Sequence, residues 1–168
     1  MKIGILGGSF DPAHKGHLAI SKEAKRRFKL EKIIWAVTKK NPLKAESKTP
    51  ISKKIKDCKE IIGLNSFIKV KFYENIIKSN KTIDLINYLK KDKKIEIFFL
   101  MGADNLINFH KWFRSKLISQ KCNIIVFDRH GYKKNSLKSK TFKQLSKTNL
   151  KFIEFNKVNI SSSQLRKI

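Results

Sequence analysis

The chain has 168 residues, of which 40% are hydrophobic, and its formal net charge is +26 at pH 7. No apolar run reaches the roughly 18 residues of a membrane span, the first residues lack a signal-peptide layout, and Cys58 and Cys122 do not suggest a disulfide framework, so we expect a cytoplasmic protein. The positive charge is mostly lysine spread over the whole chain, which favours a solvated surface that attracts anionic substrates over a nucleic-acid contact.

Strand and helix patterns alternate along the sequence, which predicts a parallel sheet with helices on both faces within a single domain, residues 1–168. In chain order we expect strand Lys2–Leu6, helix His17–Phe28, strand Lys32–Val37, helix Ser52–Gly63, strand Phe67–Phe72, helix Thr82–Lys91, strand Ile95–Met101, helix Trp112–Gln120, strand Asn123–Phe127, helix Leu137–Lys147 and strand Leu150–Phe155. Ser52 and Thr82 are expected N-caps, and Gly63 an expected C-cap. Polar loops are expected at Thr38–Pro50 and Gly131–Lys140. Ligands of such sheets bind outside the carboxyl ends of the strands.

A glycine-rich turn with two histidines follows the first predicted strand. It reads Gly7-Gly8-Ser9-Phe10-Asp11-Pro12-Ala13-His14-Lys15-Gly16-His17. Glycines let the backbone approach a ligand closely, and the N–H groups and dipole at the start of the next helix favour an anion. The spacing fits neither a P-loop nor the dinucleotide fingerprint. We expect phosphate binding here rather than a metal site, because no Cys or carboxylate partner lies at ligand spacing.

A second motif lies near the C-terminus and reads Ile160-Ser161-Ser162-Ser163-Gln164-Leu165-Arg166. Serines before a short helix give a hydroxyl-rich N-terminus, and Arg166 one turn later can fork onto phosphate oxygens. The alternative interpretation is a capped terminal helix with a surface arginine. Together with the histidine turn, the motif favours a phosphate contact.

These two segments resemble the two signatures of the nucleotidyltransferase superfamily that carries a His/Thr-x-Gly-His motif. Within that superfamily the chain most resembles the bacterial nicotinate-nucleotide adenylyltransferases, in order over nearly its whole length. The internal stretches that carry this narrower resemblance are Asn41-Pro42-Leu43-Lys44, Lys81-Thr82-Ile83-Asp84, Met101-Gly102-Ala103-Asp104-Asn105, Phe109-His110-Lys111-Trp112 and Val126–Tyr132. Lys81 stands where the family usually has Tyr. The resemblance implies a Rossmann-like nucleotidyltransferase fold.

The two tryptophans call for different interpretations. Trp112 offers a flat face on which a pyridine ring can stack, with core packing as the alternative. Trp35 lies inside an apolar strand and is expected in the core. The resemblance makes Trp112, together with Thr82, Asp84 and Lys44, the expected contacts to the acceptor substrate.

The remaining inner residues each have a physical role and an alternative. Thr82 opens a helix whose N–H groups can hold a nicotinate carboxylate, or it simply caps that helix. Asp104 follows Gly102 just past a strand, where a carboxylate reaches ribose hydroxyls or caps a helix. Lys44 and Arg129 are expected to contact phosphate or adenine, although either can be an ordinary surface cation.

The resemblance implies that the 5′-phosphate of nicotinate mononucleotide attacks the α-phosphorus of ATP, and that pyrophosphate leaves with Mg²⁺ on the phosphates. The nucleophile is already an anion, so catalysis needs positioning and charge stabilisation rather than a general base. His14, His17 and Arg166 are the expected catalytic residues. The further expected ATP contacts are Gly7, Gly8, Ser9, Phe10, Gly102, Asp104, Arg129, Ile160, Ser161 and Ser162. A monomer or a homodimer is expected, with no membrane partner.

Two other functions remain open. A phosphopantetheine adenylyltransferase would share the phosphate machinery, but that family usually has Thr at the position of His14 and lacks the Thr82, Asp104 and Trp112 segments. A basic nucleic-acid-binding protein would explain the charge, but it would leave the histidine turn unexplained.

Overall fold

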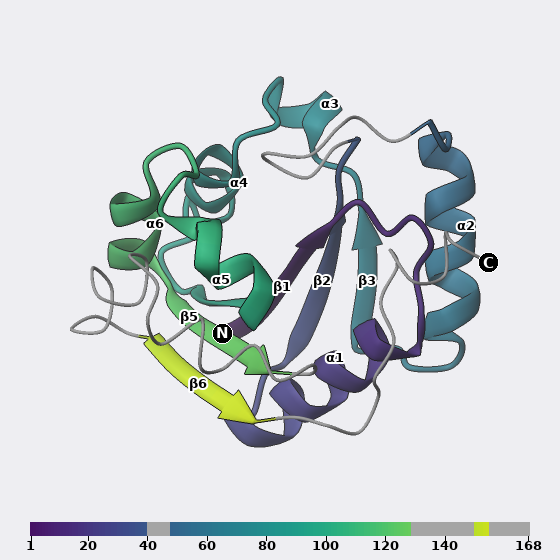
Figure 1. Ribbon diagram of the computed structural model, residues 1–168, viewed down its shortest axis with the longest axis horizontal. Coiled ribbons are helices and arrows are strands. Elements are labelled where there is room, and N and C mark those ends of the chain that lie inside the picture. Colours follow the sequence, from purple (N-terminus) through teal and green to yellow (C-terminus); the bar gives the residue numbers. More distant parts are fainter. Residues whose placement is uncertain (40–47, 129–149, 155–168) are drawn as a thin grey trace.

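The computed structural model describes residues 1–39, 48–128 and 150–154. Its centre is a six-stranded sheet in the order β3-β2-β1-β4-β5-β6, in which every pair of neighbouring strands is parallel (Figure 1). The strands are β1 (Lys2–Gly8), β2 (Lys32–Val37), β3 (Ile68–Lys71), β4 (Glu96–Gly102), β5 (Asn123–Asp128) and β6 (Leu150–Glu154). The α/β fold class expected from the sequence is confirmed.

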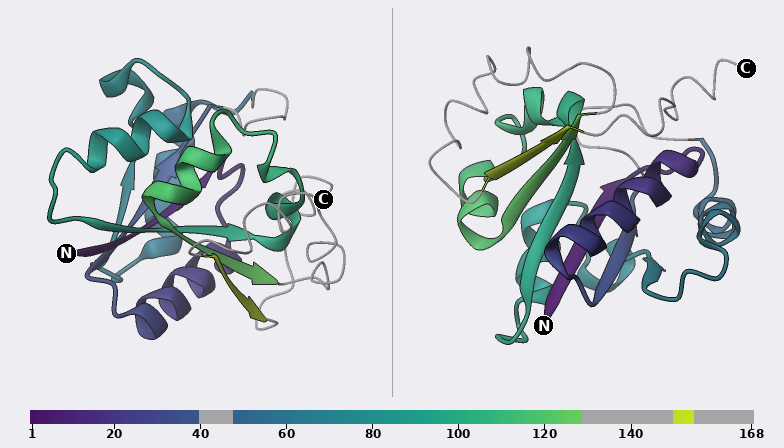
Figure 2. Two further views of the ribbon diagram at one scale, coloured as in Figure 1. Left: turned by 90° about the vertical axis from the view of Figure 1, so that its left-hand side faces the viewer. Right: turned by 90° about the horizontal axis from the view of Figure 1, so that it is seen from below.

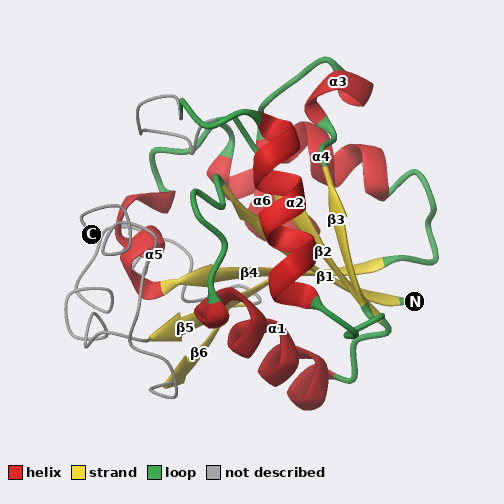
Figure 3. Ribbon diagram, turned by 90° about the vertical axis from the view of Figure 1, so that its right-hand side faces the viewer, coloured by secondary structure: helices red, strands yellow, loops and turns green. Residues whose placement is uncertain are grey.

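Helices cover both faces of this sheet because successive apolar side chains of each strand point to opposite sides. On β4, for example, Phe98 and Leu100 face one core, whereas Phe99 and Met101 face the other. One core packs against α1 (Lys15–Phe28) and α2 (Ile51–Ile62), and the other against α4 (Thr82–Leu89), α5 (Ala103–Phe109) and α6 (Ser115–Lys121). The left view of Figure 2 and Figure 3 show the molecule from opposite sides, and in Figure 3 helices α1 and α2 lie in front of the sheet.

The order of the strands reverses between β1 and β4. The chain moves from β1 outward to β2 and β3, and then returns to the other side of β1 to build β4, β5 and β6. At such a reversal the connecting segments separate and leave a crevice at the carboxyl ends of the strands. The glycine-rich turn leaves β1 at this edge, so the fold directs it into the crevice.

The structure differs from the sequence expectations in several local features. Two short helices, α3 (Glu74–Ile77) and α5, were not predicted, because each is too short to show a helical period in the sequence. The N-caps of α2 and α4 are Pro50 and Lys81, each one or two residues before the serine or threonine expected to cap. Gly63 is the C-cap of α2 as predicted, with φ of 56°. The helix expected at residues 137–147 lies outside the described residues.

None of the helices in the described part of the chain is long and apolar enough to cross a membrane.

Candidate active site

The two histidines of the turn cap helix α1 reciprocally. The backbone N–H of Gly16 donates to Nδ1 of His14 at 3.0 Å, and the backbone N–H of His14 donates to Nδ1 of His17 at 3.1 Å. Side-chain acceptors of this kind satisfy N–H groups that a helix start leaves without an intrahelical partner. Because both Nδ1 atoms accept, each neutral ring carries its proton on Nε2, where it can serve as a hydrogen-bond donor.

Aromatic packing fixes the orientation of these rings. The ring centroids of His14 and His17 are 3.9 Å apart, and the Phe10 ring lies 4.6 Å from that of His17. His14 is buried and His17 is half-buried. The first turn of α1 contains no acidic side chain, so the positive end of the helix dipole is not neutralised by a carboxylate of that turn. The arrangement suits a phosphate group.

A pocket opens beside this turn at the carboxyl ends of β1, β2 and β4. Gly7 and Gly8 form one wall, and the facing walls come from the segments after β2 and β3, from the start of α4, and from Trp112. The complete lining comprises Ile5, Gly7, Gly8, Ala36, Val37, Thr38, Tyr73, Glu74, Ile77, Ser79, Asn80, Lys81, Thr82, Leu85, Phe99, Leu100, Met101, Asn105 and Trp112. A Cβ atom added to Gly7 would stand 3.7 Å from Cζ of Phe99, an ordinary contact, so the protein itself does not require a glycine there. Such a Cβ would instead narrow the pocket.

Thr82 occupies the first position of α4 and lines the pocket, as its proposed contact with an anion requires. The turn before it is ordered by Ser79, whose hydroxyl donates to Oδ2 of Asp84 at 2.6 Å and accepts the N–H of Lys81 at 3.0 Å. Asp84 therefore shapes the entry to α4 and does not itself line the pocket. Lys81 does line it.

Trp112 combines the two roles that the sequence left open. It packs edge-on against Phe99, with ring centroids 6.1 Å apart at 88°, and against Phe109, at 5.0 Å and 61°. It is only partly buried, and it lines the pocket. Trp35, in contrast, has no exposed surface and belongs to the core, as predicted.

Gly102 and Asp104 lie at the end of β4, next to the pocket rather than in its wall. Gly102 is the N-cap of α5, and Asp104 is an exposed residue of the first turn of that helix. The neighbouring residues Met101 and Asn105 do line the pocket.

The sequence marked neither Tyr73 nor Glu74 as a site residue, and it quoted Asn105 only within a longer stretch; all three line the pocket. The hydroxyl of Thr38 is hydrogen-bonded to the carboxylate of Glu74, which ties the end of β2 to α3. Burial raises the pKa of Tyr73, so its phenol remains protonated and able to donate. Asn105 belongs to the Met101–Asn105 stretch that carries the resemblance, whereas no local pattern marks Tyr73 or Glu74.

Several expected site residues lie outside the described residues, and their predicted roles remain predictions. They are Lys44, Arg129, Ile160, Ser161, Ser162 and Arg166. Within the described ranges, no group of three or more His, Cys, Asp or Glu side chains could hold a metal ion.

The sheet order and the histidine turn at the carboxyl end of β1 define a nucleotidyltransferase-type α/β domain, and the chain matches the family model described as cytidylyltransferase-like over residues 5–168. It therefore belongs to the cytidylyltransferase-like family, and the relatives that follow place it among the nicotinate-nucleotide adenylyltransferases within that family. The chain is 68% identical over 167 residues to a protein named probable nicotinate-nucleotide adenylyltransferase from Pelagibacter ubique (strain HTCC1062), covering 99% of this chain and 93% of the relative. A protein of the same name from Ruegeria sp. (strain TM1040) is 36% identical over 78% of this chain and 69% of its own length.

Solved structures with the same fold include the nicotinic acid mononucleotide adenylyltransferase of Plasmodium falciparum complexed with NaAD. It superposes with a TM-score of 0.78 at 23% identity, covering 99% of this chain and 82% of the other. The crystal structure of a protein described as a putative nicotinate-nucleotide adenylyltransferase from Vibrio parahaemolyticus has a TM-score of 0.65 at 16% identity, covering 99% of this chain and 84% of the other. At these identities the superpositions establish the Rossmann-like nucleotidyltransferase fold.

Proposed function

We propose that this chain transfers AMP from ATP to nicotinate mononucleotide, releasing pyrophosphate and forming nicotinic acid adenine dinucleotide, a step of NAD biosynthesis. The observation that carries the proposal is the reciprocal cap of His14 and His17 at the start of α1, beside a pocket lined by Gly7, Thr82 and Trp112. The curated relatives, which bear the name of this activity, support it.

The histidine turn performs the phosphoryl chemistry in this proposal. The phosphate of the mononucleotide is already an anion, so no group has to remove a proton from it. The Nε2–H groups of His14 and His17 donate to phosphate oxygens of ATP, and His17 stabilises the charge that develops on the transferred group. The N–H groups of Gly8, Ser9 and Phe10 and the N-terminus of α1 help to hold the same phosphates. Mg²⁺ is part of the substrate, bound to ATP.

The pocket receives the acceptor. The pyridine ring lies against the exposed part of Trp112, and its carboxylate points to the first N–H groups of α4 at Thr82. The ammonium group of Lys81 adds a positive charge at the same rim. Asp84 supports the entry to α4 indirectly, and Asp104 at the end of β4 accepts hydrogen bonds from the ribose of ATP.

The residues outside the described ranges complete the proposed site. Ser162 and Arg166 hold the β- and γ-phosphates and stabilise the leaving pyrophosphate, beside Ile160 and Ser161. Lys44 contacts a phosphate of the acceptor, and Arg129 lies near the adenine or its phosphates.

The test uses the purified full chain with ATP, Mg²⁺ and one acceptor at a time: nicotinate mononucleotide, nicotinamide mononucleotide or phosphopantetheine. Product mass and pyrophosphate release are followed together. We expect nicotinic acid adenine dinucleotide with the first acceptor at a rate well above the other two. Product with phosphopantetheine alone would retain the phosphate chemistry and overturn the acceptor assignment, whereas no product with any acceptor would overturn the proposed function.

A further inference from the structure

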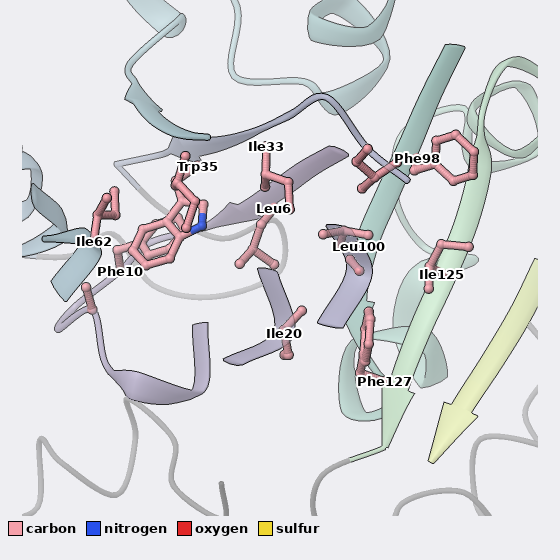
Figure 4. Packing of buried hydrophobic residues seen from close by; sticks show 14 of the residues in the cluster. Leu6, Phe10, Ile20, Ile33, Trp35, Ile62, Phe98, Leu100, Ile125 and Phe127 are labelled. Carbon is pink, nitrogen blue, oxygen red and sulfur yellow. The ribbon is translucent and has the colours of Figure 1, made fainter. Parts of the chain in front are cut away.

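Trp35 lies in the middle of strand β2, outside the pocket, yet hydrogen bonds and aromatic rings both connect it to the histidine turn. It has no exposed surface and packs in the core between the sheet and helices α1 and α2 (Figure 4). A tryptophan chosen only to fill a core carries an indole N–H that must still find a partner. The partner that Trp35 uses belongs to α1.

The first contact is a chain of two hydrogen bonds. The indole Nε1–H of Trp35 donates to Oγ of Ser21 at 2.8 Å, and the same hydroxyl donates to the backbone carbonyl of His17 at 2.8 Å. Ser21 has no exposed surface, so neither bond competes with water. A helical serine that bonds only to the carbonyl four residues earlier stays within its own helix. Here the hydroxyl instead joins the first turn of α1 to the neighbouring strand.

The second contact is a stack of aromatic rings. The ring of Phe10 lies 5.2 Å from that of Trp35 at 16°, and Figure 4 shows the two rings side by side. Phe10 itself has φ of 48°, in the left-handed region that a residue with a Cβ rarely adopts. Strain of this kind persists only where packing over-determines the conformation. The ring of His17 lies 4.6 Å from that of Phe10 and 5.8 Å from that of Trp35, so the three rings pack against one another and Trp35 supports His17 through ring contacts as well as through the backbone.

We propose that Trp35 and Ser21 are positioning residues for His17, holding its ring where it meets the transferred phosphate. This inference rests on the proposed function, in which His17 is the catalytic group. Phosphoryl transfer depends on placing donors against the transition state to within a fraction of an ångström, and such precision requires a rigid supporting contact. Trp35 provides that support from the strand whose carboxyl end forms the pocket.

The test compares Ser21→Ala, Trp35→Phe and the double variant. Both single changes break the hydrogen bond between Trp35 and Ser21, Ser21→Ala also removes the bond to the carbonyl of His17, and Phe keeps an aromatic ring against Phe10. We expect each single variant to lower kcat about tenfold, with the Kd of a non-hydrolysable ATP analogue changed less than about twofold, because the phosphate contacts remain but the ring is placed less accurately. The double variant is expected to show the same kcat as Ser21→Ala alone. Trp35→Leu, which also removes the ring stack, is expected to lower kcat further.

Stability separates positioning from simple packing. Ser21→Ala leaves a buried indole N–H without its acceptor, whereas the double variant has no such group, so its Tm should match that of Trp35→Phe alone. A positioning role predicts that kcat remains low in the double variant, whatever Tm does. The matched control is Ser119→Ala, which removes a buried serine of α6 whose hydroxyl donates within its own helix, to the carbonyl of Lys116 at 2.6 Å. It should lower Tm and keep full kcat.

Two failures can be distinguished. If the unmodified chain forms no adenylylated product, the proposed function is wrong. If it does, and Ser21→Ala and Trp35→Phe keep the kcat of Ser119→Ala, then Trp35 is a core residue only and this inference is overturned.

Discussion

The two halves of the site are built in different ways. The histidine turn is contiguous in sequence, and its key hydrogen bonds join residues two or three positions apart. The pocket proposed for the acceptor is lined by residues of β1, β2, β4 and the segments around α3, α4 and α5. A contiguous turn can keep its chemistry while substitutions in any of the many segments around a pocket change the ligand that the pocket fits. In the proposed function this difference corresponds to a division of labour, in which the turn sets the rate of adenylyl transfer and the pocket selects the acceptor.

The largest effect is expected from His17→Ala. Removing a donor to the transition-state charge should lower kcat by about 10³-fold, for every acceptor equally. Loss of half of the reciprocal cap should reduce the free energy of unfolding by about 1 kcal/mol, so the fold is retained. Steady-state kinetics and urea unfolding measure both quantities. The control Lys22→Ala removes an exposed charge one turn further along α1 and should leave kcat unchanged; near-normal kcat in His17→Ala contradicts the role of the turn.

Trp112→Ala is expected to act on the other half of the site. Loss of the stacking face should raise KM for the mononucleotide by about 10- to 100-fold, with a smaller change in kcat and in KM for ATP. The KM of Trp112→Phe for the mononucleotide should lie between that of the unmodified chain and that of Trp112→Ala. Because Trp112 also packs against Phe109, stability will drop, and Phe28→Ala in the opposite helical layer controls for that loss. A rise in KM for ATP alone would show that the pocket had been assigned to the wrong substrate.

Lys81→Ala should have a smaller and more selective effect. Lys81 is exposed at the rim of the pocket, where solvent screens its charge. Its loss should reduce the preference for nicotinate over nicotinamide mononucleotide, measured as the ratio of kcat/KM values, by about two- to fivefold. The effect should shrink at 0.5 M salt, and Lys93→Ala, an exposed lysine away from the pocket, should leave the ratio alone. An unchanged ratio in Lys81→Ala assigns recognition of the carboxylate to α4 alone.

The smallest effect is expected on stability alone, at Glu23 of α1, which lies outside both the histidine turn and the pocket. Hydrogen bonds from Arg26 and Arg27 lower the pKa of Glu23 from 4.5 to about 2. A lowered pKa stabilises the folded chain above pH 5, and this contribution is lost as the pH falls towards 2. Glu23→Gln should therefore cost about 1 kcal/mol at pH 7, and the difference from the unmodified chain should disappear near pH 2. Urea unfolding between pH 2 and pH 7 measures this difference in the free energy of unfolding. The more exposed ion pair of Asp57 and Lys53 is the control, because its loss should cost less. A difference independent of pH would mean that packing, not charge, stabilises Glu23.

The same contrast explains what the sequence could predict. The strands and the histidine turn follow from local patterns, and Trp35 in an apolar strand was correctly assigned to the core. Glu74 reaches the pocket only because β2 and α3 meet in the fold, and its contact with Thr38 spans 36 positions that no local pattern encodes. The contact between Ser21 and Trp35 likewise joins a helix to a strand 14 positions away, and no local pattern encodes it. Helix α3 was missed because a single turn leaves no periodicity.

The most direct test of the division of labour is the ratio of kcat/KM for nicotinate mononucleotide to that for nicotinamide mononucleotide, measured for the unmodified chain, His17→Ala and Trp112→Ala. We expect His17→Ala to lower both kcat/KM values by about the same factor, so that their ratio stays unchanged. Trp112→Ala should instead raise KM for the acceptors and keep most of kcat. A ratio that shifts with His17→Ala, or a kcat that falls as far in Trp112→Ala as in His17→Ala, would contradict the account and show that the two halves act as one unit.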